Sequence, residues 1–576
     1  MDMAHFHTKK KRGRPYLYVR EIARVHGKPK VISQVYIGSP ERVRKLACGQ
    51  DAEEERLKVE EWGSLFLAQQ ADKDIDMAGI VDSVIGQTER ETGPTVGEYF
   101  LYCVWNRMIQ SVSKRALANW YKHTAVQQIR PVDLSELTSQ RYWDKWDMVS
   151  AEDLRQIGRK FFEKIWEIDR PTADCLLFDT TNYFTYLAAE TKSSLAKRGH
   201  SKDGKPQLRQ VGLALLVDRG SRIPLFYREY PGNMHDSKLF EALMDEMFGV
   251  IYNLKQTKDC LTVVIDKGMN SEDNILWIDE HARVHFVTSY SPYFAEDLAV
   301  IPLERFEPVD TEKNLRLEKE NKNNERLLAH RTAGEFWGKE RTVVITYNPA
   351  TARKQAYTLD SKMEQVRQEL LEMRAKVRER AVHWRRPEEI TDRYIRLCER
   401  IHMPSDLYNL EFTQDKNSLL MSFRKDMYRI KRKQETFGKN IIITDHSDWS
   451  TTAIVQAHLD RWQVEDRFRQ SKDDDLVSMR PVRHWTDSKI RCHLFSCVVA
   501  LTYLRRLERR LSAVGISRTA ADVMADMRRL HSVLSFRNGA RTPRRRIESP
   551  SKTQSEVLSA LGYAVDNWGV LQGRKG

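Results

Sequence analysis

The chain has 576 residues, of which 41% are hydrophobic and 31% are charged, and its formal net charge is +14. The length predicts two to four domains, and the hydrophobic content is sufficient for buried cores, which excludes a chain without a folded core. The basic excess points first to a polyanionic partner such as nucleic acid, with a generic basic soluble protein as the alternative.

Cysteine usage and hydropathy give no sign of secretion or of a membrane. Seven cysteines are scattered along the chain without a Cys-x2-Cys pair, which favours a reducing compartment over a disulfide framework. The longest apolar run, at 493–504, is too short to span a bilayer. The N-terminus lacks the apolar core of a signal peptide. We therefore expect a cytoplasmic protein with no membrane partner.

The N-terminal region, residues 1–60, is basic. Residues 15–38 alternate in two β-like runs around HGKPK, which predicts a β-hairpin with basic edges. A cluster of five cations precedes it and predicts a nucleic-acid contact: Lys9, Lys10, Lys11, Arg12 and Arg14. Residues 61–165 have helical periodicity, with a buried helix over 95–110, and we expect a helical region for DNA binding or assembly.

Residues 166–300 change to alternating strands and helices. Helices are predicted at 236–252 and at 271–282, the second with Ser271 as its cap. Five strands are predicted, at 174–181, 210–218, 223–230, 261–266 and 284–291. This order indicates the first part of a mixed α/β sheet with helices packed on it.

Residues 301–438 interrupt this pattern and are expected to form an insertion domain. After a strand at 341–348, six apolar residues repeat at spacings of 4, 3, 4, 3 and 4, which predicts a coiled-coil-like seam: Leu359, Met363, Val366, Leu370, Met373 and Val377. A second helix begins at Pro387, so a helical hairpin is expected over 351–403, with short strands after it. The hairpin is interpreted either as a holder of DNA or of a partner subunit, or as a structural brace.

Residues 439–515 return to the α/β pattern with a strand at 439–445, followed by a helix that Ser450 caps. At 100° per residue, one continuous helix would place four residues on a single stripe: His458, Arg461, Glu465 and Lys472. Such a stripe is either a solvated ladder of ion pairs or one wall of an active site. Residues 516–576 are expected to be a helical region and a polar tail, with a basic loop over 537–552.

Three carboxylates form a constellation that indicates chemistry. Asp179 and Asp266 each close a predicted buried strand, where ligands usually bind in α/β sheets, and Glu465 lies on the later helix. Hard cations such as Mg²⁺ prefer oxygen ligands. Two ions about 4 Å apart can activate a nucleophile and stabilise a leaving oxygen in phosphoryl transfer. The constellation is therefore typical of two-metal phosphoryl transfer.

The chain resembles a DDE transposase of a bacterial insertion sequence, of the class with the signature Tyr-x2-Arg-x3-Glu-x6-Lys. Arg461, Glu465 and Lys472 match this spacing, while His458 stands where the family has Tyr. The first-acid motif matches LLFDTTNYF and the second matches VVIDKGMNSEDN. Supporting matches are GHSKDGKPQLRQVGLAL, YPGNMHD and MRPVRHWTDSKIRCHLF, and the resemblance covers roughly residues 170–510.

The resemblance implies a ribonuclease-H-like fold in which Asp179, Asp266 and Glu465 are the catalytic residues and hold two Mg²⁺ ions, for which Mn²⁺ can substitute. It implies a transposase that binds the terminal inverted repeats, cleaves the ends by metal-dependent hydrolysis and joins the 3′-hydroxyls to target DNA. The implied partners are double-stranded DNA, as element ends and target, and a second copy of the chain in a homodimeric synaptic complex. The implied location is the bacterial cytoplasm, at the nucleoid.

Further residues receive roles from the same resemblance. Arg461 and Lys472 would hold phosphates near the metals, and His458 would replace the phosphate hydrogen bond of the family Tyr. Trp485 is interpreted either as a stacking platform for a displaced base or as a core residue. Asn233 and Asp236 are interpreted as pocket-rim or turn residues.

Two alternative functions remain open. The first is a metal-dependent nuclease of the same fold that cuts without strand transfer, because the metal chemistry is shared. The second is a transposase-derived DNA-binding protein that has lost catalysis, although the presence of all three acids disfavours it. A helical scaffold built on the seam is disfavoured by the buried α/β strands.

Overall fold

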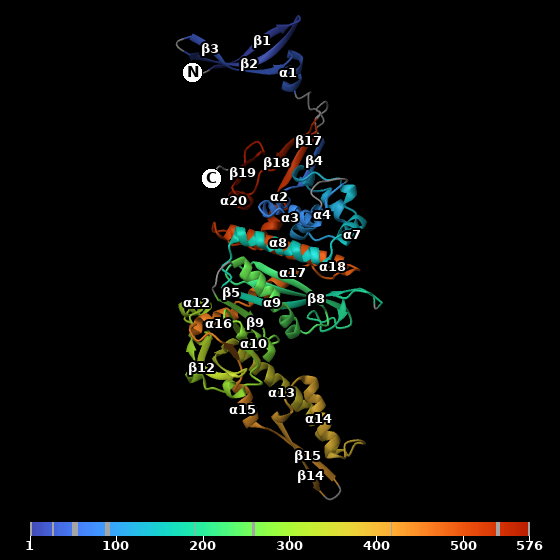
Figure 1. Cartoon of the computed structure of the whole chain (residues 1–576), viewed down its shortest axis with the longest axis vertical. Helices are drawn as coiled ribbons and strands as arrows, with labels where there is room; N and C mark the ends of the chain where they lie inside the picture. Colours follow the sequence, from blue (N-terminus) through green and yellow to red (C-terminus); the bar gives the residue numbers. More distant parts are fainter. Residues whose placement is uncertain are drawn as a thin grey trace. The chain divides into compact units, whose positions relative to one another are not determined.

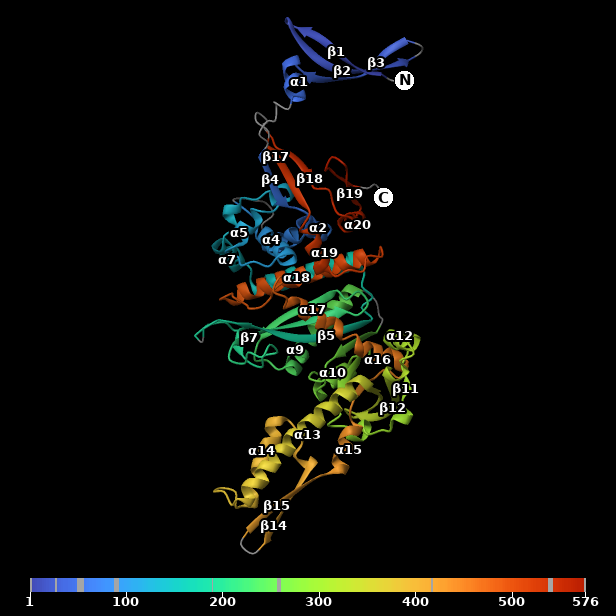
Figure 2. The same ribbon diagram turned by 180° about the vertical axis from the view of Figure 1, so that it is seen from behind.

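The computed structural model describes residues 3–25, 28–48, 56–86, 93–188, 190–255, 260–415, 418–536 and 542–573. The chain divides into two compact units (Figures 1 and 2). The first unit contains Met1–Leu67, Ala118–Leu134 and Ala513–Gly576, and the second contains Ala68–Leu117 and Ser135–Ser512. No helix in the described part of the chain is both long and apolar enough to cross a membrane. All seven cysteines are free, as their spacing predicts.

The first unit begins with an antiparallel sheet of three strands, β1 (Met3–Lys11), β2 (Arg14–Val25) and β3 (Lys28–Gly38). The predicted hairpin over 15–38 is confirmed, but β1 was not predicted, because its sequence is basic and has little apolar alternation. Arg12 and Gly13 both have positive φ and form the two-residue turn between β1 and β2. Such a turn matches the natural twist of a hairpin. It places the predicted basic cluster at the exposed end of this hairpin.

A second sheet in this unit joins distant parts of the chain. β17 (His531–Phe536) pairs with β4 (Arg56–Glu61) on one side and with β18 (Arg544–Ile547) on the other. The prediction of a helical region over 516–576 is therefore only partly right, since α19 (Ala520–Met527) and α20 (Lys552–Ala560) are its helices. β17 pairs with β4, which lies almost five hundred residues earlier, and this pairing determines the strand more than the local sequence pattern does. Residues 537–541 of the predicted basic loop lie outside the described residues.

The second unit is built on a large mixed sheet. Its first five long strands are β5 (Cys175–Thr185), β7 (Arg209–Asp218), β8 (Pro224–Pro231), β9 (Leu261–Ile265) and β10 (Val284–Tyr290). Their spatial order is β8–β7–β5–β9–β10. The pairs β5/β7 and β7/β8 are antiparallel, whereas β5/β9 and β9/β10 are parallel. The five predicted strands and the mixed α/β class are confirmed.

The sheet continues beyond β10 through strands that come later in the chain. They are β16 (Lys439–Thr444), β13 (Lys339–Tyr347), β12 (Leu328–Phe336) and β11 (Glu307–Pro308), and at the other side the short β6 (Lys197–Arg198) pairs with β7. Three of these strands fall within 301–438, the segment expected to be an insertion domain. That segment therefore contributes an extension of the central sheet as well as a separate structure.

Helices cover the sheet because its central strands are apolar on both faces. Every residue of β7 after its first is buried, and such strands are found where helices pack on both sides. The predicted helices are α9 (Asp236–Lys255) and α10 (Glu272–Glu280). Ser271 lies at the N-cap of α10, as predicted, but its side chain makes no capping hydrogen bond.

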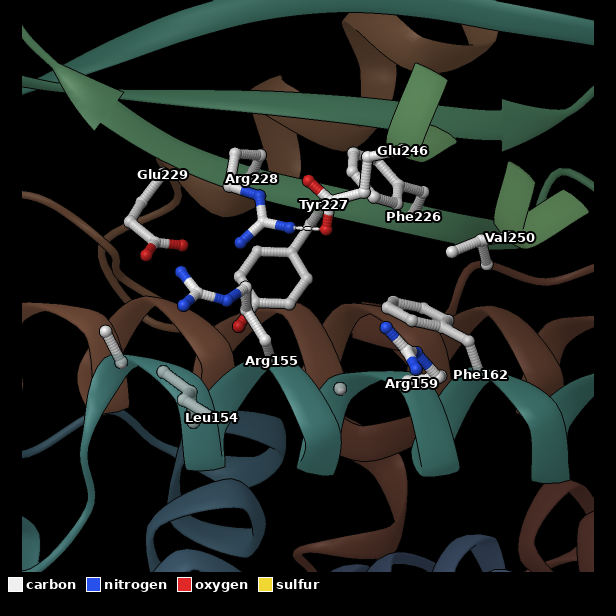
Figure 3. Close-up of a pocket in the computed structure, with 12 residues that line it drawn as sticks. Leu154, Arg155, Arg159, Phe162, Phe226, Tyr227, Arg228, Glu229, Glu246 and Val250 are labelled. Atoms are coloured by element: carbon white, nitrogen blue, oxygen red, sulfur yellow. Dashed lines mark hydrogen bonds and ion pairs between the residues drawn. The ribbon is translucent and has the colours of Figure 1, made fainter. Parts of the chain in front are cut away.

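A layer of long helices supports β8. Figure 3 shows α8 (Ala151–Asp169) facing this strand, with Tyr227 of β8 and Phe162 of α8 between them. Tyr227 also stacks on Phe495 of α18 (Asp487–Ser512), and Arg228 pairs with Glu246 of α9. The predicted buried helix over 95–110 is α4 (Val96–Ile109), which is buried throughout and packs against α18.

Two buried histidines, His493 of α18 and His484 just before this helix, make stability depend on pH. Burial lowers the pKa of His484 and of His493 well below the ordinary value, and the nearby Lys114 and Arg107 lower it further. Stability is full above the ordinary pKa of about 6.5 and is lost as the pH falls below it, because only the unfolded chain takes up these protons. For two such groups, we expect the free energy of unfolding to fall by roughly 1.5 kcal/mol between about pH 7.5 and 6.

Urea unfolding at the two pH values measures this loss. The variant His493→Gln should show about half of it, because one titrating imidazole is removed. Unfolding midpoints that are equal at both pH values, or higher at the lower pH, would contradict the assignment of these histidines as buried and neutral.

The remaining part of the insertion, residues 349–435, has its own hydrophobic core, and we call it the arm. It contains α13 (Pro349–Arg378), α14 (Pro387–Ile401), β14 (Tyr408–Asp415), β15 (Ser418–Lys425) and α15 (Met427–Glu435) (Figures 1 and 2). All six seam residues of α13 are buried, as predicted. They pack against α14 and also against the hairpin β14–β15, so the seam lies in a core that all three elements form.

Candidate active site

The parallel register of β5 and β9 brings two of the predicted carboxylates to the same level. The paired residues run from Cys175 opposite Thr262 to Leu177 opposite Val264. Continuing this register by two residues places Asp179 level with Asp266. Side chains two residues apart along a strand point to the same face of the sheet, so each acid lies on the same face as the paired residue two positions before it. Asp179 lies within β5, which runs on to Thr185, so the prediction that the strand ends at Asp179 is wrong. The pairing with β9 ends two residues before Asp179, at Leu177.

The predicted single helix that carries Glu465 is two helices in the structure. α16 (Thr451–Leu459) is capped by Ser450, as predicted, and α17 (Trp462–Ser471) begins after a break at Asp460 and Arg461. The expectation of one continuous stripe is therefore wrong. The break coincides with two tertiary ion pairs, since Asp460 accepts a hydrogen bond from Arg219 at 2.6 Å and Arg461 turns toward Asp266.

α17 is held against the sheet next to Asp179. It packs on β5 and β7, and the buried hydroxyls of Tyr183 and Ser471 lie 2.7 Å apart. Its first turn carries Glu465, whose side chain is 60% exposed. The helix therefore presents Glu465 to the side of the sheet on which Asp179 and Asp266 lie.

Arg461 lies among the three carboxylates. Its Nη1 donates a hydrogen bond to Asp266 Oδ1 at 2.9 Å, and its Nη2 lies 3.7 Å from Glu465 Oε1. Its charge also lowers the pKa of Asp179, with Lys202. Burial outweighs both and raises the pKa of Asp179 to about 6. Asp179 is thus a partly buried acid whose charge its protein neighbours compensate only in part.

The three carboxylates line a single open cavity of about 670 Å³. Cations surround it: Lys202, Arg461, Arg469, Lys472 and Arg480. The predicted phosphate-holding residues Arg461 and Lys472 are therefore both present at the site. Lys202 and Arg480 were not predicted individually, although both lie in the supporting motifs of the resemblance.

Lys202 connects the loop that carries it to the first acid. Its Nζ donates to the carbonyl of Thr180 at 2.7 Å and lies 3.6 Å from Asp236. Asp236 contacts Lys202, but neither Asp236 nor the exposed Asn233 lines the cavity, so the structure does not bear out their interpretation as pocket-rim residues. The exposed Asp473, Asp474 and Asp475 follow α17, and the first of them reaches the cavity rim.

Asp203 fixes two of these cations. Lys472 Nζ lies 2.9 Å and Arg480 Nη1 lies 3.2 Å from its buried Oδ1. Asp203→Asn removes the shared counter-charge with little change in volume. We expect cleavage at saturating DNA to slow about tenfold, since small misplacements of positioning groups have large effects on rate. DNA affinity should be unchanged or higher, because both cations keep their charge.

Single-turnover cleavage and equilibrium binding separate these two effects. Lys339→Gln is a suitable control, because it perturbs a half-exposed ion pair with Asp279 outside the cavity. A normal cleavage rate in Asp203→Asn, or a loss of affinity without a loss of rate, would show that Asp203 does not position the cations.

His458 and Trp485 lie outside the cavity lining. Burial, together with the charge of Arg461, lowers the pKa of His458 to about 4, so the imidazole is neutral at pH 7 and can donate one hydrogen bond. Trp485 is 77% exposed, so the core interpretation of this residue is wrong. The five cations of the N-terminal cluster belong to the first unit and do not line this cavity.

The donor set fits hard divalent cations, because it offers carboxylate oxygens in an open cavity. In the described residues, no three His, Cys, Asp or Glu side chains are grouped closely enough to hold a metal ion. The three acids instead surround Arg461. The arrangement is thus an acidic cluster balanced by an internal cation, and Asp179 retains uncompensated charge that a divalent ion would neutralise.

Comparisons with known proteins identify the family of the chain. The family described as transposase DDE domain matches residues 185–503, which include Asp266 and Glu465, while Asp179 lies six residues before the match. No curated protein matches the chain. Among solved structures, the cryo-EM structure of the piggyBac transposase synaptic complex with hairpin DNA matches with a TM-score of 0.35 and 10% identity, over 81% of this chain and 79% of that chain. Because the family match covers more than half of the 576 residues, the chain belongs to the transposase DDE domain family.

Proposed function

We propose that the chain is the transposase of a bacterial insertion sequence, which binds the element's terminal inverted repeats, cleaves the DNA ends and joins the 3′-hydroxyls to target DNA. The observation that carries this proposal is the convergence of Asp179, Asp266 and Glu465 on one open cavity surrounded by cations. A cavity of this kind suits a polyanionic substrate and divalent cations together.

The sheet topology supports a ribonuclease-H-like core. In that fold the first three strands are antiparallel, the first strand is followed in the sheet by the fourth and fifth in parallel, and acids lie on the first and fourth strands. The order β8–β7–β5–β9–β10 has this arrangement, with Asp179 on β5 and Asp266 directly after β9. The sheet extension and the arm then separate these strands from α17, which carries Glu465.

In the proposed mechanism, Asp179, Asp266 and Glu465 hold two Mg²⁺ ions, for which Mn²⁺ can substitute. Two such ions supply activation of the attacking water or 3′-hydroxyl and stabilisation of the leaving oxygen. Arg461 exchanges its contact with Asp266 for a DNA phosphate, and Lys472, which lines the same cavity, holds a second phosphate. His458, which is neutral, supplies at most one hydrogen bond to a phosphate.

The partners follow from the reaction. Both element ends must meet in one complex, so we propose a homodimer that assembles on double-stranded DNA in the bacterial cytoplasm. Trp485 is exposed and can serve as a stacking platform for a displaced base, which remains the proposed role of this residue.

A strand-transfer assay tests the function. The purified protein is incubated with Mg²⁺, a labelled duplex of the terminal repeat from the DNA flanking the gene, and a supercoiled target plasmid. Labelled plasmid is the result that the proposal predicts. Cleaved duplex without joined product would favour the nuclease, and bound but uncut duplex would favour a DNA-binding protein that has lost catalysis.

Salt-dependent binding tests the role of the N-terminal cluster. Lys9, Lys10, Lys11, Arg12 and Arg14 are exposed around one hairpin turn. Each phosphate contact contributes a slope of about −0.9 to log K against log salt. Changing all five residues to Gln should therefore weaken binding and lower the slope by up to about 4.5.

Fluorescence anisotropy over a salt series measures both quantities. Lys313→Gln with Lys319→Gln, two exposed lysines of the second unit, is the control and should leave the slope nearly unchanged. An unchanged affinity and slope after all five changes would exclude the cluster as a DNA contact.

A further inference from the structure

A second cavity lies beside the candidate active site and is lined by cations. Its volume is about 520 Å³, and its cations are Arg107, Lys114, Arg115, Arg480 and Arg483. No Asp or Glu is among the described side chains that line it. Arg480 lines both this cavity and the one that contains the three carboxylates. The two cavities are thus neighbours that differ in charge: acids and cations together line the first, whereas cations without any Asp or Glu line the second.

Lys114 is a buried lysine of this cavity whose acidic neighbour is a thiol, that of Cys103, and not a carboxylate. It is 5% exposed, its Nζ lies 2.8 Å from Cys103 Sγ, and it lies over the ring of Trp146 at 4.9 Å. It forms no ion pair with a carboxylate in the described part of the chain. Burial lowers the pKa of Lys114, and the Cys103 thiol opposes this only in part. A bound anion would stabilise the charged ammonium.

Three buried polar atoms at the same cavity have no hydrogen-bond partner among the described residues: Arg107 Nε, Ser111 Oγ and His484 Nδ1. Arg107 is held in place by Nη1, which donates to the carbonyls of Val477 and Ser478 at 3.3 Å. Buried polar groups are nearly always paired, so three orphaned atoms around one cavity indicate an absent ligand with several oxygen atoms.

We propose that this cavity binds a backbone phosphate of a DNA strand that leaves the active site, with Arg480 at the boundary between the two. The inference rests on the proposed function and adds a second anchoring point to it. A tetrahedral phosphate presents oxygens to Arg107, Ser111 and Lys114 at once. The exposed Arg115 and Arg483 complete the entrance, where a strand can enter without unfolding the protein.

Neutral phosphate analogues identify such a contact. A duplex of the terminal repeat is prepared as a series in which single phosphates are replaced by methylphosphonate, and binding to the full chain is measured. The variant is Arg115→Gln with Arg483→Gln, which changes only exposed side chains, and the control is Arg155→Gln with Arg159→Gln, two exposed arginines of α8 that line a different pocket. Lys114→Met in a third protein removes the buried charge, and its melting temperature shows whether it folds.

We expect one position at which methylphosphonate weakens binding to the wild type and the control about tenfold, but has little effect on the variant. The salt slope of the variant should fall by about 0.9 for each DNA phosphate that the substituted side chains no longer bind. If variant and wild type agree in affinity, slope and methylphosphonate pattern, the proposal is overturned.

Two further outcomes separate the sources of the anion and the two proposals. If inorganic phosphate alone raises the melting temperature of the wild type but not of the variant, and no methylphosphonate position depends on the variant, the cavity holds a free anion and the DNA assignment is overturned. If the pocket variant behaves as wild type while Asp179→Asn loses metal-dependent cleavage, only the pocket fails. If the wild type neither binds nor cleaves the duplex, both proposals fail.

Discussion

Asp179→Asn is expected to abolish cleavage of an element-end duplex, with a loss of about 10³-fold or more, while DNA binding remains. The substitution keeps the shape of the side chain but removes the charge of a partly buried acid that lies level with Asp266. Metal ions contribute several kcal/mol to charge stabilisation in such reactions, and each 1.36 kcal/mol corresponds to about tenfold in rate. Asp266→Asn and Glu465→Gln should have losses of similar size.

Binding and folding must be measured with cleavage, because Asp266 also accepts the hydrogen bond from Arg461. Asp473→Asn is a matched control, since this acid lies at the rim of the same cavity but is exposed and bonds to backbone N–H groups of its own turn. It should retain cleavage within a few-fold. Activity close to wild type in any one of the three triad variants would remove that residue from the catalytic set.

Deletion of the arm is expected to abolish paired-end joining while single-end cleavage continues. The arm leaves the sheet between β13 and β16, whose ends pair as Tyr347 opposite Lys439. The N–H of Asn348 donates to the carbonyl of Gly438 at 2.8 Å, and Gly438 has φ of +72°. Removing residues 349–437 would therefore leave Asn348-Gly438 as a two-residue turn, the sequence that such hairpins prefer.

The reason for the expected loss is the separate core of the arm. Its seam is buried against its own α14 and β14–β15, so the arm can fold without building the catalytic cavity. Its outer positions carry several cations, among them Arg374, Lys376 and Arg378, which are exposed and available to DNA or to a second copy of the chain. Changing these cations to Gln in the intact chain tests the same surface without a deletion.

Three outcomes decide between the interpretations of the arm. Loss of joined product with cleavage retained supports a role in assembly. Survival of both reactions would show that the arm is dispensable. Failure of the deleted chain to fold, despite the preformed turn, would identify the arm as a brace for the sheet.

The strands around the site could be predicted because their signals are local. LTVVI and its neighbours are apolar runs between turn residues, and Asp266 directly follows one of them. The break before α17 could not be predicted, because it coincides with ion pairs of Asp460 and Arg461 with residues about 200 to 240 positions away. β1 and β17 escaped prediction for a similar reason, since pairing with a distant or weakly apolar partner defines them.

The site shows the same division between local and tertiary information. The spacing of Arg461, Glu465 and Lys472 was visible in the sequence. The ion pairs of Asp203 with Lys472 and Arg480 could not be predicted from the sequence, because they join two segments that only the fold brings together. The resemblance nevertheless identified motifs around Asp203 and Arg480. It did not show that the two residues contact each other.

Binding of Mn²⁺ in the presence of uncut element-end duplex tests the central claim most directly. Electron paramagnetic resonance measures bound Mn²⁺ without requiring turnover, and the wild type is compared with Asp179→Asn and with a variant in which all three acids are changed to their amides. The account predicts two ions per active site in the wild type, weaker binding in the single variant and none at this site in the triple variant. Equal Mn²⁺ binding in all three proteins would contradict the claim that Asp179, Asp266 and Glu465 form one metal site.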